Sequence, residues 1–215
     1  MDDTNKNIEI NSNEISEDFY FTIKEQKREE IKVKKSRFIA TAIPVKSKEE
    51  ALEKLDKIKV EFHDSRHNCF AYRIGNGGLE YRYSDDGEPN NSAGKPILFS
   101  IKKYNYSDIL VVVTRFFGGT KLGKGPLARA YGESAELTLE ICEPEKVDIT
   151  KEVIVFCTYE DINVIKRLTS QYAIKFEEDY KDSIQIKAEI PVTKVEEFCD
   201  QITQLTSARA GFRVM

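Results

Sequence analysis

The segment 108–141 constrains the fold most, because an apolar run, a glycine-rich loop and a long helical pattern follow one another there. Residues 109–113 (ILVVV) are continuously apolar, which is typical of a strand buried on both faces. The loop GGTKLGKGP follows, and Pro126 suits the first turn of the helix predicted over 127–141. The segment therefore indicates a mixed fold with a buried internal strand.

The residues before this segment alternate between strand and helix patterns. Ser47, with Glu50 three residues later, forms a capping-box signal in front of apolar residues at helical spacing. Asn76-Gly77, between two short strand patterns, is a strong hairpin signal. The predicted elements are a strand hairpin within 20–45 that ends at Pro44, a helix from 47, strands at 69–75 and 79–84, and a short helix near 97–104.

The glycines mark a domain boundary. Ten of the eleven lie between Gly75 and Gly132, and only Gly211 lies beyond. From about residue 148 the pattern reads βαββαβ, with a hairpin turn at Lys181-Asp182, which is the order of a ferredoxin-like unit. We therefore expect an α+β chain of two domains. The expected parts are a disordered tail at 1–16, an N-terminal domain at 17–145, a linker within 144–150 and a C-terminal domain at 148–215.

Composition and charge narrow the class of protein. No run of about 18 apolar residues and no secretory leader is present, so we expect a cytoplasmic protein without a membrane partner. The four cysteines are scattered among apolar residues and are expected to be buried, reduced thiols. The net charge of −4 is uneven: residues 1–18 carry −5, residues 19–146 carry +4 and residues 147–215 carry −3. The middle segment therefore suits an anionic partner.

Three carboxylates gather in the loop that follows the second strand of the predicted hairpin. Asp85, Asp86 and Glu88 would repel one another unless a cation or a basic surface joined them. The loop therefore admits two functions, a metal site or a contact for a basic partner, beside a purely structural role as a solvated turn. It lacks the alternating ligands of an EF-hand, and we predict no bound metal and no cofactor.

A second group of residues lies in the glycine-rich loop and at the start of the helix behind it. Glycines let a ligand approach the backbone closely, and a helix N-terminus attracts anions. The spacing matches neither a Walker A loop nor a dinucleotide-binding fingerprint. A cradle for phosphate or for the RNA backbone and a tight structural turn both remain open. The predicted anion-binding residues are Arg115, Gly118, Gly119, Lys121, Gly123, Lys124 and Arg129.

Five separated blocks of sequence resemble the YigZ/IMPACT family, and the likeness spans roughly residues 18–140. The blocks are KKSRFIA (34–40), HNCFAYRIG (67–75), RYSDDGEP (82–89), AGKPIL (93–98) and the segment 111–131. The chain departs from the family pattern at Asn90-Asn91-Ser92 and at Pro126. The resemblance implies a shared surface that includes Asp85, Asp86, Glu88, Arg115, Gly118, Gly119, Lys121, Gly123 and Tyr131.

The resemblance also implies a fold and a function. The first domain is expected to be similar to an α/β fold of ribosomal proteins and of domain IV of elongation factor G, and residues 148–215 to a ferredoxin-like domain of that factor. We expect a translation-associated regulatory or binding protein that contacts RNA phosphate, the ribosome or a translation-associated protein, without DNA sequence specificity. The alternative is a metal-dependent enzyme that acts on a phosphorylated substrate through the SDDGEP loop; the patterns lean away from an enzyme.

Overall fold

The computed structural model describes residues 18–180 and 184–215. They divide into two compact units: unit 1 is Tyr20–Val147, and unit 2 is residues 18–19 with Asp148–Met215. Each unit has a sheet and a core of its own. The expected disordered tail at 1–16 and the predicted turn at Lys181-Asp182 lie outside the described residues.

Unit 1 is built on a five-stranded sheet with the order β2-β3-β6-β4-β5, in which all neighbouring strands are antiparallel. The predicted hairpins at 20–45 and 69–84 are both present, with their turns at Lys34-Lys35 and at Asn76–Gly78. The elements are β2 (Lys27–Val33), β3 (Ser36–Pro44), α1 (Lys48–Glu61), β4 (His67–Ile74), η1 (Asn76–Gly78), β5 (Glu80–Ser84), α2 (Gly94–Lys103), β6 (Ile109–Phe116) and α3 (Lys124–Glu140).

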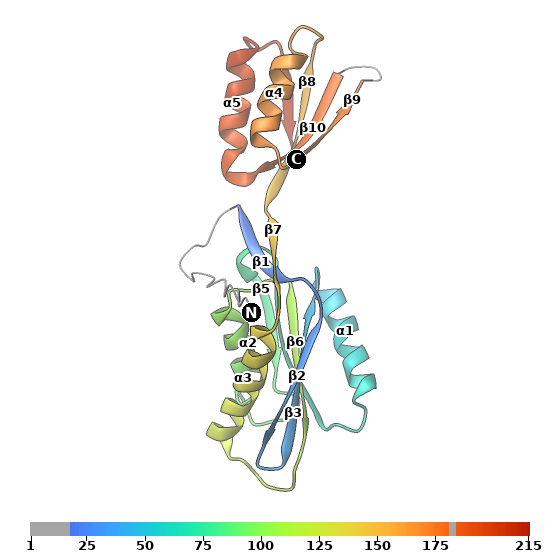
Figure 1. Cartoon of the computed structure of the whole chain (residues 1–215), viewed down its shortest axis with the longest axis vertical. Helices are drawn as coiled ribbons and strands as arrows, with labels where there is room; N and C mark the ends of the chain where they lie inside the picture. The colour runs from blue at the N-terminus through green and yellow to red at the C-terminus, as the bar shows by residue number, and fades with distance from the viewer. Residues whose placement is uncertain (1–17, 181–183) are drawn as a thin grey trace, which may run out of the picture. The chain divides into compact units, whose positions relative to one another are not determined.

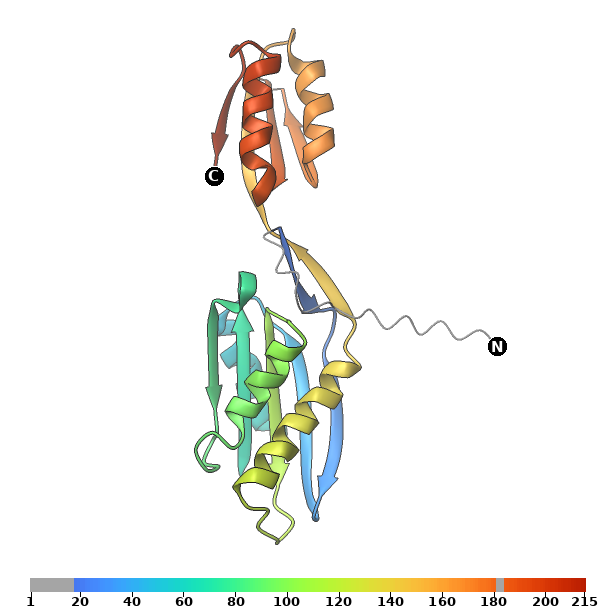
Figure 2. The ribbon, with the colours of Figure 1, turned by 90° about the vertical axis from the view of Figure 1, so that its left-hand side faces the viewer.

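Helices cover both faces of this sheet. Helix α1 lies on one face, and α2 and α3 lie side by side on the other (Figures 1 and 2). Strand β6 is central: Val111 and Val113 belong to the core under α2 and α3, and Leu110 and Val112 to the core under α1. The prediction of a strand buried on both faces is confirmed, because alternate side chains of a strand enter opposite layers.

The start of α1 follows the sequence signal. The Ser47 hydroxyl accepts a hydrogen bond from the Glu50 backbone N–H at 3.1 Å. The Glu50 carboxylate in turn accepts from the Lys46 backbone N–H at 2.9 Å, one residue before the position that a standard capping box would use. The side chains of Ser47 and Glu50 thus accept hydrogen bonds from two backbone N–H groups at the start of α1.

The sequence analysis did not anticipate a two-stranded sheet at the chain ends of unit 1. Strand β1 (Phe19–Ile23) pairs with β7 (Pro144–Asp148). Residues 144–148 were expected to belong to a linker, and they form a strand instead. The Lys24 N–H, donated to the Glu143 carbonyl at 3.0 Å, extends the contact beyond β1. The two chain ends of unit 1 are thus joined to each other by backbone hydrogen bonds.

Unit 2 has the predicted βαββαβ order of elements. These are β8 (Thr150–Cys157), α4 (Ile162–Tyr172), β9 (Lys175–Asp179), β10 (Ile184–Pro191), η2 (Val192–Lys194), α5 (Val195–Leu205) and β11 (Gly211–Val214). The sheet order is β11-β8-β10-β9 with antiparallel neighbours, and both helices cover one face (Figure 2). Over the described parts of the chain, no helix is long and apolar enough to cross a membrane.

Candidate functional site

The first carboxylate of the acidic loop caps a helix. Asp85 Oδ1 accepts hydrogen bonds from the backbone N–H groups of Ala93 and Gly94, both at 2.9 Å, and Oδ2 accepts from that of Asn91 at 2.8 Å. Ala93 and Gly94 begin α2, where backbone N–H groups have no partner within the helix. Asp85 therefore holds the loop to the start of α2.

The second carboxylate of the loop holds it to the sheet. Asp86 Oδ2 accepts a hydrogen bond from the Asn68 backbone N–H at 2.6 Å. The Asp86 carbonyl lies 2.8 Å from His67 Nδ1, and the Cys69 thiol donates to the Asp85 carbonyl at 3.0 Å. These contacts join the loop to the first residues of β4. The Asp86 carboxylate therefore has a structural partner in unit 1.

The third carboxylate is buried in an ion pair. Glu88 Oε1 lies 2.6 Å from Arg115 Nη1 and accepts a hydrogen bond from the Tyr131 hydroxyl at 2.8 Å. The Glu88 and Arg115 side chains are only 6% and 7% exposed. Burial, with Cys69 and Glu88 beside it, holds the pKa of the Tyr131 phenol far above its usual range, so the phenol stays protonated and donates to Glu88.

The three carboxylates therefore point to three different places. Among the described residues, no group of three or more His, Cys, Asp and Glu side chains could hold a metal ion. Asp85 caps α2, Asp86 joins the loop to β4, and Glu88 pairs with Arg115. The mutual repulsion that suggested a cation site is relieved by the fold itself.

Arg115 likewise faces inward instead of joining the basic loop behind it. Its guanidinium lies over the rings of Phe38 and Phe117, at 5.4 and 5.5 Å from their centroids. Phe117 is 47% exposed and covers the guanidinium with one ring face. The structure thus separates Arg115 from the other predicted anion-binding side chains, which are exposed.

The glycine-rich loop packs against the turn between β2 and β3. The Gly118 N–H donates to the Ser36 hydroxyl at 3.2 Å. A Cβ atom at Gly118 would lie 2.1 Å from the backbone carbon and oxygen of Lys35, so only glycine fits this close approach. Gly119 and Gly123 have positive φ angles of 84° and 82° and open space around them. The loop is therefore fixed at Gly118 and open beyond it.

This contact brings two lysine-bearing segments to one end of unit 1. Lys34 and Lys35 form the β2–β3 turn, and Lys121 and Lys124 belong to the glycine-rich loop and the first turn of α3. All four are exposed. Both segments lie at the same end of the sheet in the two views (Figures 1 and 2). Residues 31–37 and 114–132 contain no acidic residue.

We call Lys34, Lys35, Lys121, Lys124 and the exposed Arg129 of α3 the basic end. The sequence analysis identified Lys121, Lys124 and Arg129 but did not include Lys34 and Lys35. Both of these occupy the left-handed region, with φ of 44° and 68°, where lysine is uncommon. The sequence did offer a signal for these two residues, because adjacent lysines stand in a tight hairpin turn where Asn-Gly is the usual choice.

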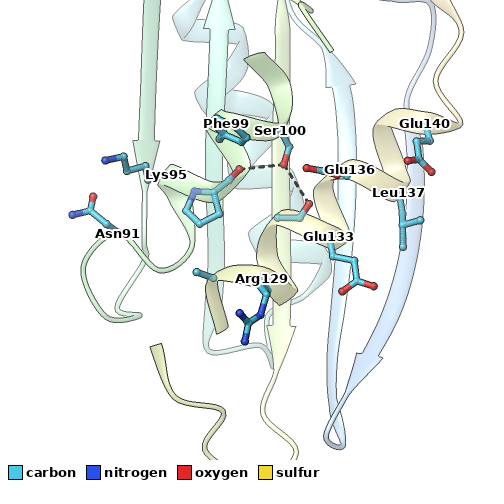
Figure 3. Close-up of a pocket in the computed structure, with 12 residues that line it drawn as sticks. Asn91, Lys95, Phe99, Ser100, Arg129, Glu133, Glu136, Leu137 and Glu140 are labelled. Atoms are coloured by element: carbon cyan, nitrogen blue, oxygen red, sulfur yellow. Dashed lines mark hydrogen bonds between the residues drawn. The ribbon is translucent and has the colours of Figure 1, made fainter. Parts of the chain in front are cut away.

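A groove lies between α2 and α3, the two helices that cover one face of the sheet. Its volume is about 740 Å³. Its lining includes small or compact residues, among them Pro96, Ser100, Ala128 and Gly132. Ser100 Oγ lies within hydrogen-bond distance of two carbonyl oxygens, that of Pro96 at 3.1 Å and that of Gly132 at 3.3 Å (Figure 3). Arg129 belongs to both the groove and the basic end.

Comparison with known proteins defines the class first. The Impact N-terminal domain matches residues 34–139, and a domain of unknown function, DUF1949, matches residues 155–209. The two matches fall in unit 1 and in unit 2 respectively. A crystal structure titled as that of a hypothetical protein has a TM-score of 0.64 and 26% identity, over 91% of this chain and 96% of the other. The chain is thus an α+β protein that combines these two domains.

Relatives of similar length identify the family. IMPACT family member YvyE of Bacillus subtilis is 34% identical over 196 residues, which cover 90% of each chain. IMPACT family member YigZ of Escherichia coli is 30% identical over 81% of this chain and 87% of its own length. This protein belongs to the IMPACT family, as the sequence blocks predicted. The likeness of its domains to ribosomal proteins and to elongation factor G stays a prediction.

Proposed function

We propose that this protein binds RNA through the phosphates that meet its basic end, and that it acts in association with translation. The observation that carries the proposal is the convergence of Lys34-Lys35 and Lys121-Lys124 through the Gly118 contact. Lysines that lie close together without intervening acids attract a phosphate backbone, whereas isolated surface lysines are ordinary.

Backbone strain at the turn supports a binding role for Lys34 and Lys35. A non-glycine residue in the left-handed region costs of order 1 kcal/mol, and such strain tends to occur at functional sites. Asn and Gly are the preferred residues in such a turn, so two lysines there are unusual. Neither side chain has an ion-pair partner within residues 18–180 and 184–215, so both charges remain available to a ligand.

The metal-dependent enzyme has less support. Its motivation was the set of three clustered acids, and each of these carboxylates has a structural partner within unit 1. A metal ion would have to displace backbone N–H groups from Asp85 and Asp86 and an arginine from Glu88. RNA binding requires no such rearrangement, because the basic end is already exposed.

The test is co-sedimentation with purified ribosomes, together with titration of an RNA strand at several salt concentrations. The variant K34Q/K35Q/K121Q/K124Q removes four charges and keeps side-chain length. The matched control K46Q/K48Q/K57Q/K59Q removes four exposed lysines before and along α1, away from the glycine-rich loop. Arg115 is excluded from the variant, because its loss would leave Glu88 buried without its partner.

We expect the wild type and the control to sediment with ribosomes and the basic-end variant to remain in the supernatant. Four phosphate contacts to a single strand give a slope of about −3 for log K against log salt, and the variant should flatten the slope by that amount. Equal sedimentation of all three proteins, with equal salt slopes, would show that the basic end does not bind RNA.

A further inference from the structure

We propose that the groove between α2 and α3 receives an unstacked base of a single-stranded RNA whose phosphates lie along the basic end. This inference rests on the proposed function, since it assigns a place to the bases of the strand that the lysines hold. It extends the site onto a surface that the glycine-rich loop does not form. The first argument is the shape of the groove.

The groove exists because α3 presents small residues to α2. Ala128 and Gly132 lie one turn apart on α3, and a Cβ atom at Gly132 would lie 3.8 Å from Pro96 Cβ and 4.0 Å from Ser100 Oγ. The packing of the two helices would therefore tolerate an alanine at Gly132, and glycine leaves the volume of that methyl group open. A volume of about 740 Å³ is within the usual range for small-molecule sites, roughly 300–1,000 Å³.

An aromatic ring stands exposed at the edge of this space. Phe99 is 68% exposed, although burial of a phenylalanine side chain is worth about 1.5–3 kcal/mol. Leu137, on α3, is 38% exposed and also lines the groove. An exposed ring beside basic residues is the usual platform for an unpaired base, because every base has a face that stacks.

Two basic residues, Lys95 and Arg129, line the groove together with Phe99 and could meet the phosphates of a nucleotide. Lys95 precedes Phe99 by four residues, so both lie on the same side of α2, and Arg129 reaches the groove from α3 (Figure 3). Arg129 follows Lys124 by five residues on α3, so one helix carries both a residue of the groove and a lysine of the basic end. A strand that follows the lysines would reach Phe99 past Arg129, whereas the glutamates of the groove lie farther along α3.

One carboxylate of the groove is positioned to read the base. Glu133 follows Arg129 by four residues on α3 and has no ion pair within the part of the chain that the structure describes. The two neighbouring acids are engaged: Glu136 lies 2.8 Å from Lys103 Nζ, and Glu140 accepts from the Tyr104 hydroxyl at 3.1 Å. A carboxylate accepts hydrogen bonds from an exocyclic amino group, such as N4 of cytosine. We therefore expect cytosine to be preferred to uracil.

The experiment uses single-stranded RNA of about twelve nucleotides, all cytosine or all uracil, and a duplex of the same length. Binding is followed by fluorescence anisotropy, and a 2-aminopurine placed in the strand reports stacking directly. Phe99→Ala removes the ring and Phe99→Leu keeps its apolar bulk. The control, Tyr159→Ala, removes a 77% exposed ring from unit 2.

We expect Phe99→Ala and Phe99→Leu to weaken binding of the cytosine strand about tenfold, because stacking on an aromatic ring is worth about 1–3 kcal/mol per base. The salt slope should not change, since no phosphate contact is lost. The quenching of 2-aminopurine should disappear in both variants and persist in the control. Glu133→Gln should reduce the preference for cytosine over uracil.

The outcomes separate this inference from the proposed function. If the basic-end variant loses RNA binding while both Phe99 variants bind and quench like the wild type, the groove takes no base and the inference is wrong, whereas the proposed function stands. Duplex binding as tight as single-strand binding would equally overturn the inference, because paired bases cannot enter the groove. If the basic-end variant binds RNA unchanged, the proposed function itself fails.

Discussion

The buried ion pair between Glu88 and Arg115 makes the sharpest prediction about stability. Glu88→Ala removes the carboxylate and leaves the guanidinium, 7% exposed, with its ring contacts and a long hydrogen bond of 3.5 Å to the Ser36 hydroxyl. It also removes the acceptor of the Tyr131 hydroxyl. A buried charge that loses its partner costs about 3–5 kcal/mol. This is a large share of the roughly 5–15 kcal/mol by which a domain is stable.

The assay is urea unfolding followed by hydrogen exchange and mass spectrometry, because the chain contains no tryptophan. Peptides that cover β6 report unit 1, and peptides that cover β10 report unit 2 as an internal reference. With a urea m-value of about 1.5 kcal/mol/M, the midpoint of unit 1 should fall by about 2–3 M. The midpoint of unit 2 should not move.

The matched control is Glu30→Ala. Glu30 also pairs with an arginine, Arg37 at 2.8 Å, but the side chains are 33% and 48% exposed. Solvent screens such a pair, so its loss should cost less than about 1 kcal/mol. The double variant E88M/R115M, which removes both buried charges, should be more stable than Glu88→Ala. Equal midpoints for the Glu88 and Glu30 variants would refute the argument from burial.

Three further perturbations test the loops and the core. Gly118→Ala should lower the urea midpoint of unit 1, because its Cβ would overlap the backbone at Lys35, whereas Gly125→Ala, with nothing within 4 Å, should be neutral or slightly stabilising. Asp85→Ala should cost about 1–2 kcal/mol in chemical denaturation, because α2 loses its cap. Burial raises the pKa of the Cys142 thiol to about 12. The free energy of unfolding should therefore fall as pH rises above about 8.5, because the thiol ionises only in the unfolded chain; a Cys142→Ala variant should show a smaller fall.

Local patterns predicted the elements of the fold well. The apolar run at 109–113 identified the central strand, and Ser47 with Glu50 placed the start of α1, because both signals act over a few residues. The pairing of β1 with β7 had no such signal. The two strands lie more than a hundred residues apart, and the sequence of neither strand indicates its pairing partner.

The sequence predicted the basic character of the candidate site but not the full set of residues that form it. Loop composition identified Lys121, Lys124 and Arg129 as available cations. It could not show that Arg115 is held by Glu88, 27 residues earlier in the chain, because only the sheet brings them together. For the same reason Lys34 and Lys35 were missed: a close approach of Gly118 to another turn is a property of the fold.

The pairing of β1 with β7 has a consequence for synthesis on the ribosome. Strands β2 to β6 span residues 27–116, and β1 can already contact residues 106–108, where the Ser107 N–H donates to the Phe21 carbonyl at 2.8 Å, but its strand pairing must wait until Pro144–Asp148 emerges. Closing so long a loop is slow compared with forming local hairpins. The pairing of β1 with β7 is therefore among the last backbone contacts of unit 1 to form. A nascent chain that stops shortly before β7 should be cleaved faster within Phe19–Ile23 than one that includes β7.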